Sequence, residues 1–260
     1  MANSSRQWQS AKSYCETSRP QKSSGYAFLQ QLSPVSGCTV LDLGCGTGYL
    51  AAKLSDCVGP EGSVIAVDPD GERLKIAQEK YARDNIEYVS GDAATFPEGP
   101  YDLVFANQVI HWVADKDLLF RRVYQGLKSG GRFAFVTANG NPVWPPVASK
   151  CMDELVCPDY IGKLCRERMF FLTSDQYQEL AVSHGFVVTS MEDKDVPGFP
   201  IESVNDLIEF IFGLLHGEFD REAIGKEALQ ACREKYDVEL LKEAELYPTA
   251  RMLHVVLTKP

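Results

Sequence analysis

Short apolar runs that alternate with longer amphipathic segments constrain the fold of this chain more than any other feature of its sequence. In the longer segments, at residues 47–56, 70–85 and 115–130, apolar side chains recur at helical spacing. The short runs are almost continuously apolar, as expected for strands that are buried on both faces of a parallel sheet. They lie at residues 39–43, 63–67, 86–90, 101–106 and 131–136. The alternation predicts repeated strand–helix–strand units, and therefore an α/β fold with a doubly wound, mostly parallel sheet.

The regular alternation ends near residue 139, and the rest of the chain follows a different pattern. Residues 139–172 contain the turn-rich stretch NGNPVWPPV, which breaks helices and indicates an insertion. A helix is expected next, with Thr173 as its N-cap and Gly185 as its stop. Helical stretches within residues 200–247 then predict a cap before a last strand.

The length of 260 residues favours one domain over residues 1–260, because one α/β core with an elaboration fits it better than two independent cores. Residues 1–32 are interpreted as an amphipathic amino-terminal helix. Residues 37–138 are interpreted as the ligand-binding core of this domain.

The charge balance of the chain argues against nucleic acid as a partner. Its formal net charge is −10, and no basic stripe or Lys/Arg-rich tail occurs in it. The first ten residues, MANSSRQWQS, lack the apolar core of a signal peptide, and no later run has the roughly 18 apolar residues of a membrane span. We therefore expect a soluble, cytoplasmic protein that acts on a small molecule, and the sequence leaves its oligomeric state open.

The eight cysteines show no metal-ligand spacing, because the chain contains no C-x-x-C pair. Cys151, Cys157 and Cys165 form the one local cluster, and His184 is the nearest candidate for a fourth zinc ligand. Their irregular spacing favours reduced thiols over a zinc site, so no metal is predicted.

The stretch LDLGCGTGYL places Gly44, Gly46 and Gly48 directly after an apolar run that ends near Asp42. Glycines at alternate positions make a tight turn in which a ligand can approach the backbone. A helix starting near Thr47 would direct its free N–H groups to the same place. A dinucleotide loop requires G-x-G-x-x-G, and the sixth position here is tyrosine, so the dinucleotide fingerprint fails.

Two further acids follow strands at the edge of the sheet where α/β proteins bind ligands. Asp68 ends the run VIAVD and can accept hydrogen bonds from both hydroxyls of a ribose, or it can cap a helix that begins at Pro69. Asp92, in SGDAATFP, is a second ligand candidate or a turn-forming residue after glycine.

Taken in order, LDLGCGTG, VIAVD, GDA and YDLVFANQVIHWV resemble the four motifs of the class I S-adenosylmethionine-dependent methyltransferases. The resemblance implies a seven-stranded Rossmann-like methyltransferase fold with a helical substrate cap, and S-adenosyl-L-methionine as cofactor. It also implies that Asp42 lies near the amino group of the cofactor and that Asp68 holds its ribose. The residues that it places at the cofactor are Asp42, Gly44, Cys45, Gly46, Gly48, Asp68, Pro69, Asp92, Ala93 and Asn107.

A narrower resemblance links YCETSRP (residues 14–20) and ANQVIHWV (residues 106–113) to the branch that contains the trans-aconitate and juvenile hormone acid methyltransferases. In that branch an amino-terminal helix covers the cofactor and a helical cap forms the substrate pocket. This likeness implies that Tyr14 contacts the cofactor, although a plain packing role for Tyr14 stays open.

Methyl transfer from a sulfonium mainly requires the protein to align the nucleophile, the methyl carbon and the sulfur. A methyltransferase therefore needs no catalytic triad. His111 and Trp112 are the predicted pocket residues, with His111 either a general base or, like Trp112, a packing residue. The expected reaction is transfer of the methyl group to a small carboxylic acid. Alternatives are an amine, thiol or carbon acceptor, and a non-catalytic methyltransferase-like partner subunit.

A carboxylate substrate needs a cation, and the predicted candidates in or near the cap are Arg166, Arg168, Arg221 and Arg251. The aromatic residues Phe210 and Phe212 recur at helical spacing, which is more typical of a core than of a pocket.

Overall fold

A computed structural model describes residues 2–34, 36–198, 201–216 and 218–260. The chain forms two compact units. The sheet unit comprises residues 21–141, 170–194 and 251–260, and the helical unit comprises residues 1–20, 142–169 and 195–250. The predicted boundary of the cap at residue 200 lies outside the described residues.

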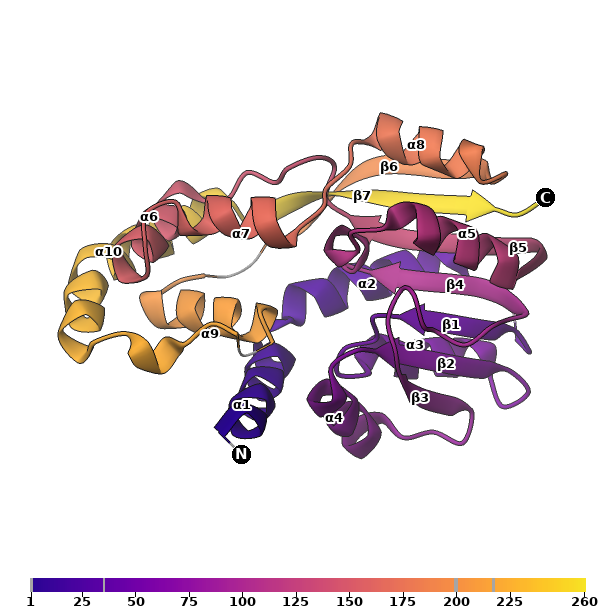
Figure 1. The fold of residues 1–260 in the computed structure, drawn as a ribbon, viewed down its shortest axis with the longest axis horizontal. Helices are drawn as coiled ribbons and strands as arrows, with labels where there is room; N and C mark the ends of the chain where they lie inside the picture. Colours follow the sequence, from indigo (N-terminus) through magenta and orange to yellow (C-terminus); the bar gives the residue numbers. More distant parts are fainter. Residues whose placement is uncertain (1, 35, 199–200, 217) are drawn as a thin grey trace. The chain divides into compact units, whose positions relative to one another are not determined.

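One seven-stranded sheet has the strand order β3-β2-β1-β4-β5-β7-β6 (Figure 1). The pairs β1/β2, β2/β3, β1/β4 and β4/β5 are parallel, and β5 pairs with β7 in antiparallel orientation. The strands are β1 (Thr39–Leu43), β2 (Ser63–Asp68), β3 (Ile86–Ser90), β4 (Tyr101–Asn107), β5 (Leu127–Thr137), β6 (Val187–Pro197) and β7 (Thr249–Thr258). The predicted α/β class and the doubly wound, mostly parallel sheet are therefore confirmed.

The sheet unit buries its strands against helices. Its helices are α2 (Arg19–Leu32), most of which belongs to this unit, α3 (Tyr49–Val58), α4 (Gly71–Tyr81), α5 (Lys116–Gly126) and α8 (Ser174–Ser183). Phe120 of α5 packs edge-on against Phe133 and Phe135 of β5, with ring centroids 5.5 and 6.1 Å away. Aromatic contacts of this kind add to the hydrophobic stabilisation of a core.

Two helix starts in the sheet unit test the expected caps. Thr173 caps α8 as predicted, because its hydroxyl accepts from the N–H of Gln176 and the Gln176 side chain accepts from the N–H of Thr173. The alternative interpretation of Asp68, as the cap of a helix that begins at Pro69, is not realised. Helix α4 begins at Gly71 instead of Pro69, and the Asp70 carboxylate caps it by accepting from the N–H groups of Glu72 and Arg73.

The amino-terminal segment forms two helices instead of one over residues 1–32. Helix α1 (Ala2–Thr17) ends before Ser18, and α2 starts at Arg19. Pro20 accounts for the break, because it lacks the N–H that would continue the hydrogen bonding of α1, whereas an N–H in the first turn of α2 has no intrahelical partner.

The helical unit contains α1, α6 (Pro146–Leu155), α7 (Tyr160–Arg168), α9 (Val204–Leu214), the 3-10 turn η2 (Arg221–Ala223) and α10 (Lys226–Leu246). Helices α6 and α7 fall within the predicted insertion, and α6 begins inside the stretch NGNPVWPPV that was expected to break helices. Pro146 begins α6, where proline is tolerated because the first N–H of a helix has no intrahelical partner.

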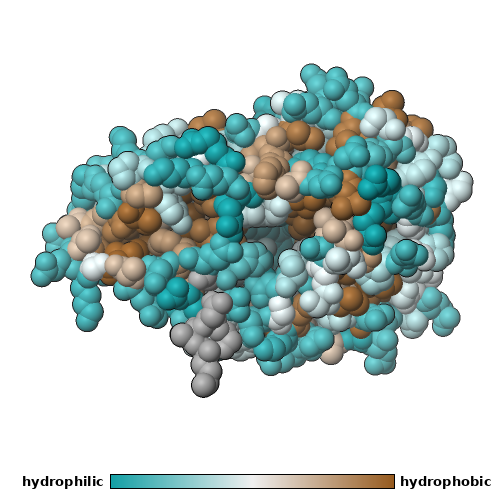
Figure 2. Space-filling model, viewed as in Figure 1, coloured by the Kyte–Doolittle hydropathy of each residue, from teal (hydrophilic) through white to brown (hydrophobic). Residues whose placement is uncertain are grey.

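Helix α9 forms the centre of the helical unit. Phe210 and Phe212 are buried in it, which agrees with a core role for the aromatic residues of the cap. A Cβ on Gly213 would lie 2.8 Å from the backbone nitrogen of Tyr14, so glycine permits close approach of α9 to α1. On the face drawn in Figure 2, apolar groups of the helical unit gather in its middle, with hydrophilic groups around them.

Candidate cofactor and active site

The candidate site lies in the sheet unit at the carboxyl ends of β1, β2 and β4. The strand order reverses between β1 and β4, which is the place where open α/β sheets bind ligands. Asp42 pairs with Phe105 across these two strands, and Asn107 lies two residues further along β4. The structure therefore brings the ends of the predicted motifs to one edge of the sheet.

All three motif glycines adopt positive φ angles, of 73° at Gly44, 55° at Gly46 and 83° at Gly48. A Cβ on Gly44 would lie 2.2 Å from a methyl group of Val109, and one on Gly48 would lie 2.7 Å from Cβ of Ala77. Only glycine fits both the conformation and the space. Helix α3 begins at Tyr49, two residues later than predicted, so residues 44–48 form a turn without side chains at its three glycines.

Asp42 is the most unusual side chain of this turn. It is 2 % exposed, and its Oδ2 has no hydrogen-bond partner among the described residues. Burial, helped by the negative charge of Asp68, raises the pKa of Asp42 to about 7. A buried acceptor of this kind fits a ligand group that carries positive charge, because the cation would supply the missing partner and stabilise the carboxylate. The same burial raises the pKa of the neighbouring Cys45 thiol and keeps it neutral.

Asp68 is buried at the end of β2 and holds the glycine turn from the side. Its Oδ2 accepts from the N–H of Gly46 at 2.8 Å, and its Oδ1 accepts from the N–H of Asp70 at 2.9 Å. Pro69 lies between Asp68 and Asp70 in the chain. Because a carboxylate offers about four lone-pair positions, each oxygen can accept one further hydrogen bond from a ligand hydroxyl.

Asp92 is exposed and organises the turn after β3. Its Oδ1 accepts from the N–H of Ala94 at 2.9 Å and from the hydroxyl of Thr95 at 2.8 Å. The turn-forming interpretation of Asp92 is therefore realised. Oδ2 forms no hydrogen bond within the described ranges, and Ala93 beside it is half-buried.

Asn107 ends β4 and meets α2. Its Nδ2 donates to the backbone carbonyl of Gln21 at 3.1 Å, while its Oδ1 and the side-chain Oε1 of Gln21 are buried without described partners. A Cβ on Gly25 would lie 2.8 Å from Cγ of Asn107, so α2 approaches the strand end closely. The contact between Gln21 and Asn107 was not predicted from the sequence. The one local signal at Gln21 is its position directly after Pro20.

His111 and Trp112 lie together in the 3-10 turn η1 (Ile110–Trp112) that follows β4. The His111 ring stacks on Phe171 at 5.3 Å, and its Nδ1 lies 3.4 Å from the hydroxyl of Thr137. Burial first, and the charge of Lys116 second, lower the pKa of His111 to about 3. The imidazole is therefore neutral near pH 7 and a weak proton acceptor.

Gln108, between Asn107 and η1, was also missed by sequence reasoning. It has a φ of 61°, although it is not a glycine. A left-handed residue of this type costs energy and often marks a functional turn. No sequence pattern of Gln108 itself indicated this conformation.

The remaining predicted residues lie in other surroundings. Tyr14 belongs to α1 of the helical unit, so its contact with a ligand of the sheet unit stays a prediction. Each of the four candidate arginines already has an acidic partner in its own unit. The pairs are Arg166–Asp159, Arg168–Glu218, Arg221–Glu209 and Arg251–Asp193.

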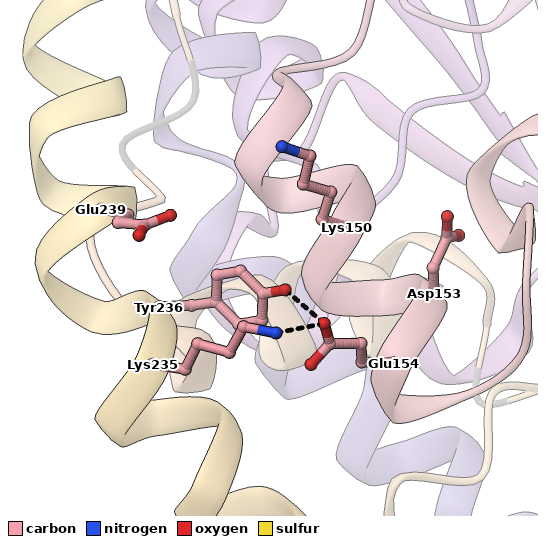
Figure 3. Close-up of a pocket in the computed structure, with 6 residues that line it drawn as sticks. All are labelled: Lys150, Asp153, Glu154, Lys235, Tyr236 and Glu239. Atoms are coloured by element: carbon pink, nitrogen blue, oxygen red, sulfur yellow. Dashed lines mark hydrogen bonds and ion pairs between the residues drawn. The ribbon is translucent and has the colours of Figure 1, made fainter.

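A surface cavity of about 470 Å³ lies in the helical unit between α6 and α10 (Figure 3). Three of its lining residues bind one another, because Glu154 accepts from Lys235 at 2.5 Å and from the Tyr236 hydroxyl at 2.6 Å. None of the motif residues lines it. We therefore assign the candidate site to the edge of the sheet and not to this cavity.

Comparison with known proteins agrees with this assignment. Residues 41–135 match the family model described as a methyltransferase domain. That segment includes the glycine turn, β2, β3, β4 and η1. The matched family thus covers the candidate site and leaves the helical unit outside the match.

Among individual relatives, the ubiquinone/menaquinone biosynthesis C-methyltransferase UbiE of Escherichia coli K12 / DH10B is 38 % identical over 123 residues. This match covers 45 % of the chain and 48 % of UbiE, so the chain spans about half the length of the curated relatives it matches. No helix among the described residues is long and apolar enough to cross a membrane.

Solved structures show the same fold over most of the chain. Phosphoethanolamine N-methyltransferase 2 of Haemonchus contortus, in complex with S-adenosyl-L-methionine, has a TM-score of 0.59 at 20 % identity, covering 91 % of this chain and 52 % of that one. A Haloferax volcanii protein in complex with the Trm112 methyltransferase activator has a TM-score of 0.59 at 17 % identity, covering 96 % and 94 %. The chain therefore has the Rossmann-like methyltransferase fold.

Proposed function

We propose that the chain is an enzyme that binds S-adenosyl-L-methionine and transfers its methyl group to a small molecule. The observation that carries the proposal is the orphaned Oδ2 of buried Asp42 beside a turn of three left-handed glycines. A cofactor that carries a protonated amino group supplies the partner that Asp42 lacks. The match of residues 41–135 to the methyltransferase domain supports the same conclusion.

In this proposal the cofactor lies along the strand ends. Asp42, Gly44, Cys45, Gly46 and Gly48 hold its methionine end, with Asn107 closing the site after β4. Asp68 and Pro69 hold the ribose, and Asp92 and Ala93 border the adenine. Tyr14 contributes from α1. The bare glycine turn leaves room for a carboxylate that a side chain would block.

When bound, S-adenosylmethionine supplies a methyl group on a sulfonium, which is an excellent leaving group for in-line displacement. The residues of the chain then have to position the acceptor and exclude water. His111 and Trp112 are the proposed pocket residues for this task. Because the pKa of His111 is lowered to about 3 by burial and by Lys116, we assign it a positioning role and not that of a base.

A small carboxylic acid is the proposed acceptor, because a carboxylate is ionised near pH 7 and needs no base. Within the methyltransferases we place the chain beside the trans-aconitate and juvenile hormone acid branch, on the stretches at residues 14–20 and 106–113. Transfer to carbon is the alternative that the identity with the C-methyltransferase UbiE favours. Amine and thiol acceptors stay as further alternatives.

The decisive experiment measures transfer of a radiolabelled methyl group from S-adenosylmethionine to a panel of small acids, amines, thiols and activated carbon acids. Asp42→Asn is the matched inactive control, since it keeps the shape of the side chain and removes its charge. We expect an acid to be methylated. Tight cofactor binding without transfer to any member would favour the non-catalytic partner subunit, and absence of cofactor binding would overturn the proposal.

A further inference from the structure

We propose that Lys116 binds the negatively charged group of the methyl acceptor, and thus selects an anion over its neutral analogue. The inference rests on the proposed methyl transfer and assigns a substrate contact outside the cofactor motifs. It also replaces the four arginines considered from the sequence, because each of those is paired with an acid.

Lys116 is a buried cation without a described anionic partner. It is 6 % exposed and is the first residue of α5. Its Nζ donates to the carbonyl of Val113 at 2.7 Å and lies 5.7 Å from the ring centroid of Phe170. No carboxylate of the described part of the chain forms an ion pair with Nζ, so two of its three protons are free to bind a ligand.

The surrounding protein groups do little to stabilise the positive charge of Lys116. A buried ammonium without an anion is destabilising, and the start of a helix disfavours a cation because the helix dipole is positive there. Burial accordingly lowers the pKa of Lys116 to about 8. By contrast, Lys75 on α4 pairs with Glu72 at 2.7 Å on the surface. A bound anion would supply what the surroundings of Lys116 lack.

The position of Lys116 connects it to the proposed reacting pocket. Lys116 begins α5 a few residues after His111 in η1, and its charge contributes, after burial, to the lowered pKa of His111. Phe170, which lies against Nζ, donates its backbone N–H to the carbonyl of His111 at 2.7 Å. Because the Thr137 hydroxyl faces Nδ1 of His111, the other ring nitrogen is the one left for a ligand. Lys116 and His111 thus present two polar groups after the strand that ends in Asn107.

The test uses the full chain saturated with S-adenosylhomocysteine and measures binding of matched probes by calorimetry. The probes are benzoate with benzamide and octanoate with octanamide. We expect the wild type to bind at least one acid about tenfold tighter than its amide, a value typical of one charge-assisted hydrogen bond. Lys116→Met should remove this preference and leave affinity for S-adenosylhomocysteine within about twofold. Lys75→Met is the matched control and should behave as wild type.

A preference for the acid that survives in Lys116→Met would overturn the proposal and leave Lys116 as a cap of η1 through Val113. A wild type that binds each acid no better than its amide would overturn it as well. Failure of the methyltransferase function is distinguishable, because the wild type would then not bind S-adenosylhomocysteine at all. If Lys116→Met does not fold, carbon-13 NMR of labelled lysine in the wild type decides. Octanoate should raise the pKa of Lys116, and an unchanged value contradicts the proposal.

Discussion

Two buried carboxylates, one in each unit, show how differently the same chemical group can be held. Glu243 of α10 is 7 % exposed, and its two oxygens accept from the N–H groups of Val147 and Ala148 at 2.8 and 3.1 Å. It therefore satisfies the start of α6, where helix N–H groups lack intrahelical partners. Asp42 is buried as deeply but keeps one oxygen without a partner among the described residues. The comparison separates a carboxylate that completes the fold from one that a ligand completes.

The largest expected effect is the loss of cofactor affinity in Asp42→Asn, by about 100-fold, because a charge-assisted hydrogen bond to a cation is removed. Calorimetric titration with S-adenosylmethionine measures it. Unchanged affinity in a folded variant would place the cofactor elsewhere.

The same variant should be more stable than the wild type when no ligand is bound. The folded pKa of Asp42 is raised to about 7 from 3.8. In the wild type the unfolded chain therefore releases this proton first, and stability falls as pH rises from about 4 to 7. The Asp42→Asn variant has no proton to release at this position and should show no such fall. The advantage of the variant in thermal unfolding should grow over that range and stay constant above pH 7, and an advantage that shrinks would contradict the assignment.

Glu243→Ala should show the opposite pattern, with stability reduced by about 2 kcal/mol and affinity for the cofactor nearly unchanged. Two N–H groups of α6 would lose their acceptor, which is the cost of an unsatisfied helix start. Denaturant unfolding measures the first quantity and calorimetry the second. Glu243→Gln, which retains one acceptor oxygen, is the matched control and should lose less stability. Equal loss of stability and cofactor affinity would remove the distinction between the two acids.

Cofactor binding itself should depend on pH. Asp42 must lose its proton to pair with a cation, so affinity for S-adenosylmethionine should rise up to about tenfold per pH unit below pH 7 and then level off. Titrations between pH 5 and 7.5 measure this slope. The Asp42→Asn variant should show no slope of this origin, and a wild-type profile that is flat below pH 7 would refute the raised pKa.

The smallest effect is expected at His111. Its buried ring is neutral near pH 7, so it extends the comparison of the buried acids Asp42 and Glu243 to a buried group without charge. His111→Gln should lower kcat/KM for an acid by less than about tenfold, through lost packing against Phe171. The pH profile of the wild type with an acid should be flat around neutrality as far as His111 is concerned, since its pKa is lowered to about 3. A steep rise between pH 6 and 8 that the substitution removes would restore the general-base role.

The sheet and its ligand edge could be predicted from the sequence because their determinants are local. Continuous apolar runs identified the strands, and the glycines at 44, 46 and 48 identified the turn, since both depend on a few adjacent residues. The Thr173 cap was predictable for the same reason.

The failures have a different physical origin. Pro145 and Pro146 were interpreted as helix breakers, but proline before and at the first helical position starts a helix as readily as it ends one. The pairing of Arg221 with Glu209 and of Arg168 with Glu218 depends on tertiary contacts that no spacing rule contains. The burial of Lys116 without a described acidic partner also depends on residues far along the chain, such as Phe170. Local sequence patterns predict strands, turns and helix ends, but they do not predict which charged side chains pair in the folded protein.

The division of the helical unit among three separate chain segments has a consequence for biosynthesis. Ser10 of α1 donates its hydroxyl to the carbonyl of Phe212 at 2.8 Å, and 202 residues separate the two. Helix α1 therefore leaves the ribosome long before α9 exists, whereas β1, β2, β3 and β4 follow one another within residues 39–107. Because loop closure over such a distance is slow, the glycine turn can assemble while α1 still exposes apolar surface. Nascent chains in which residues up to 141 have left the ribosome should thus protect β1, β2, β3 and β4 from protease more than they protect α1.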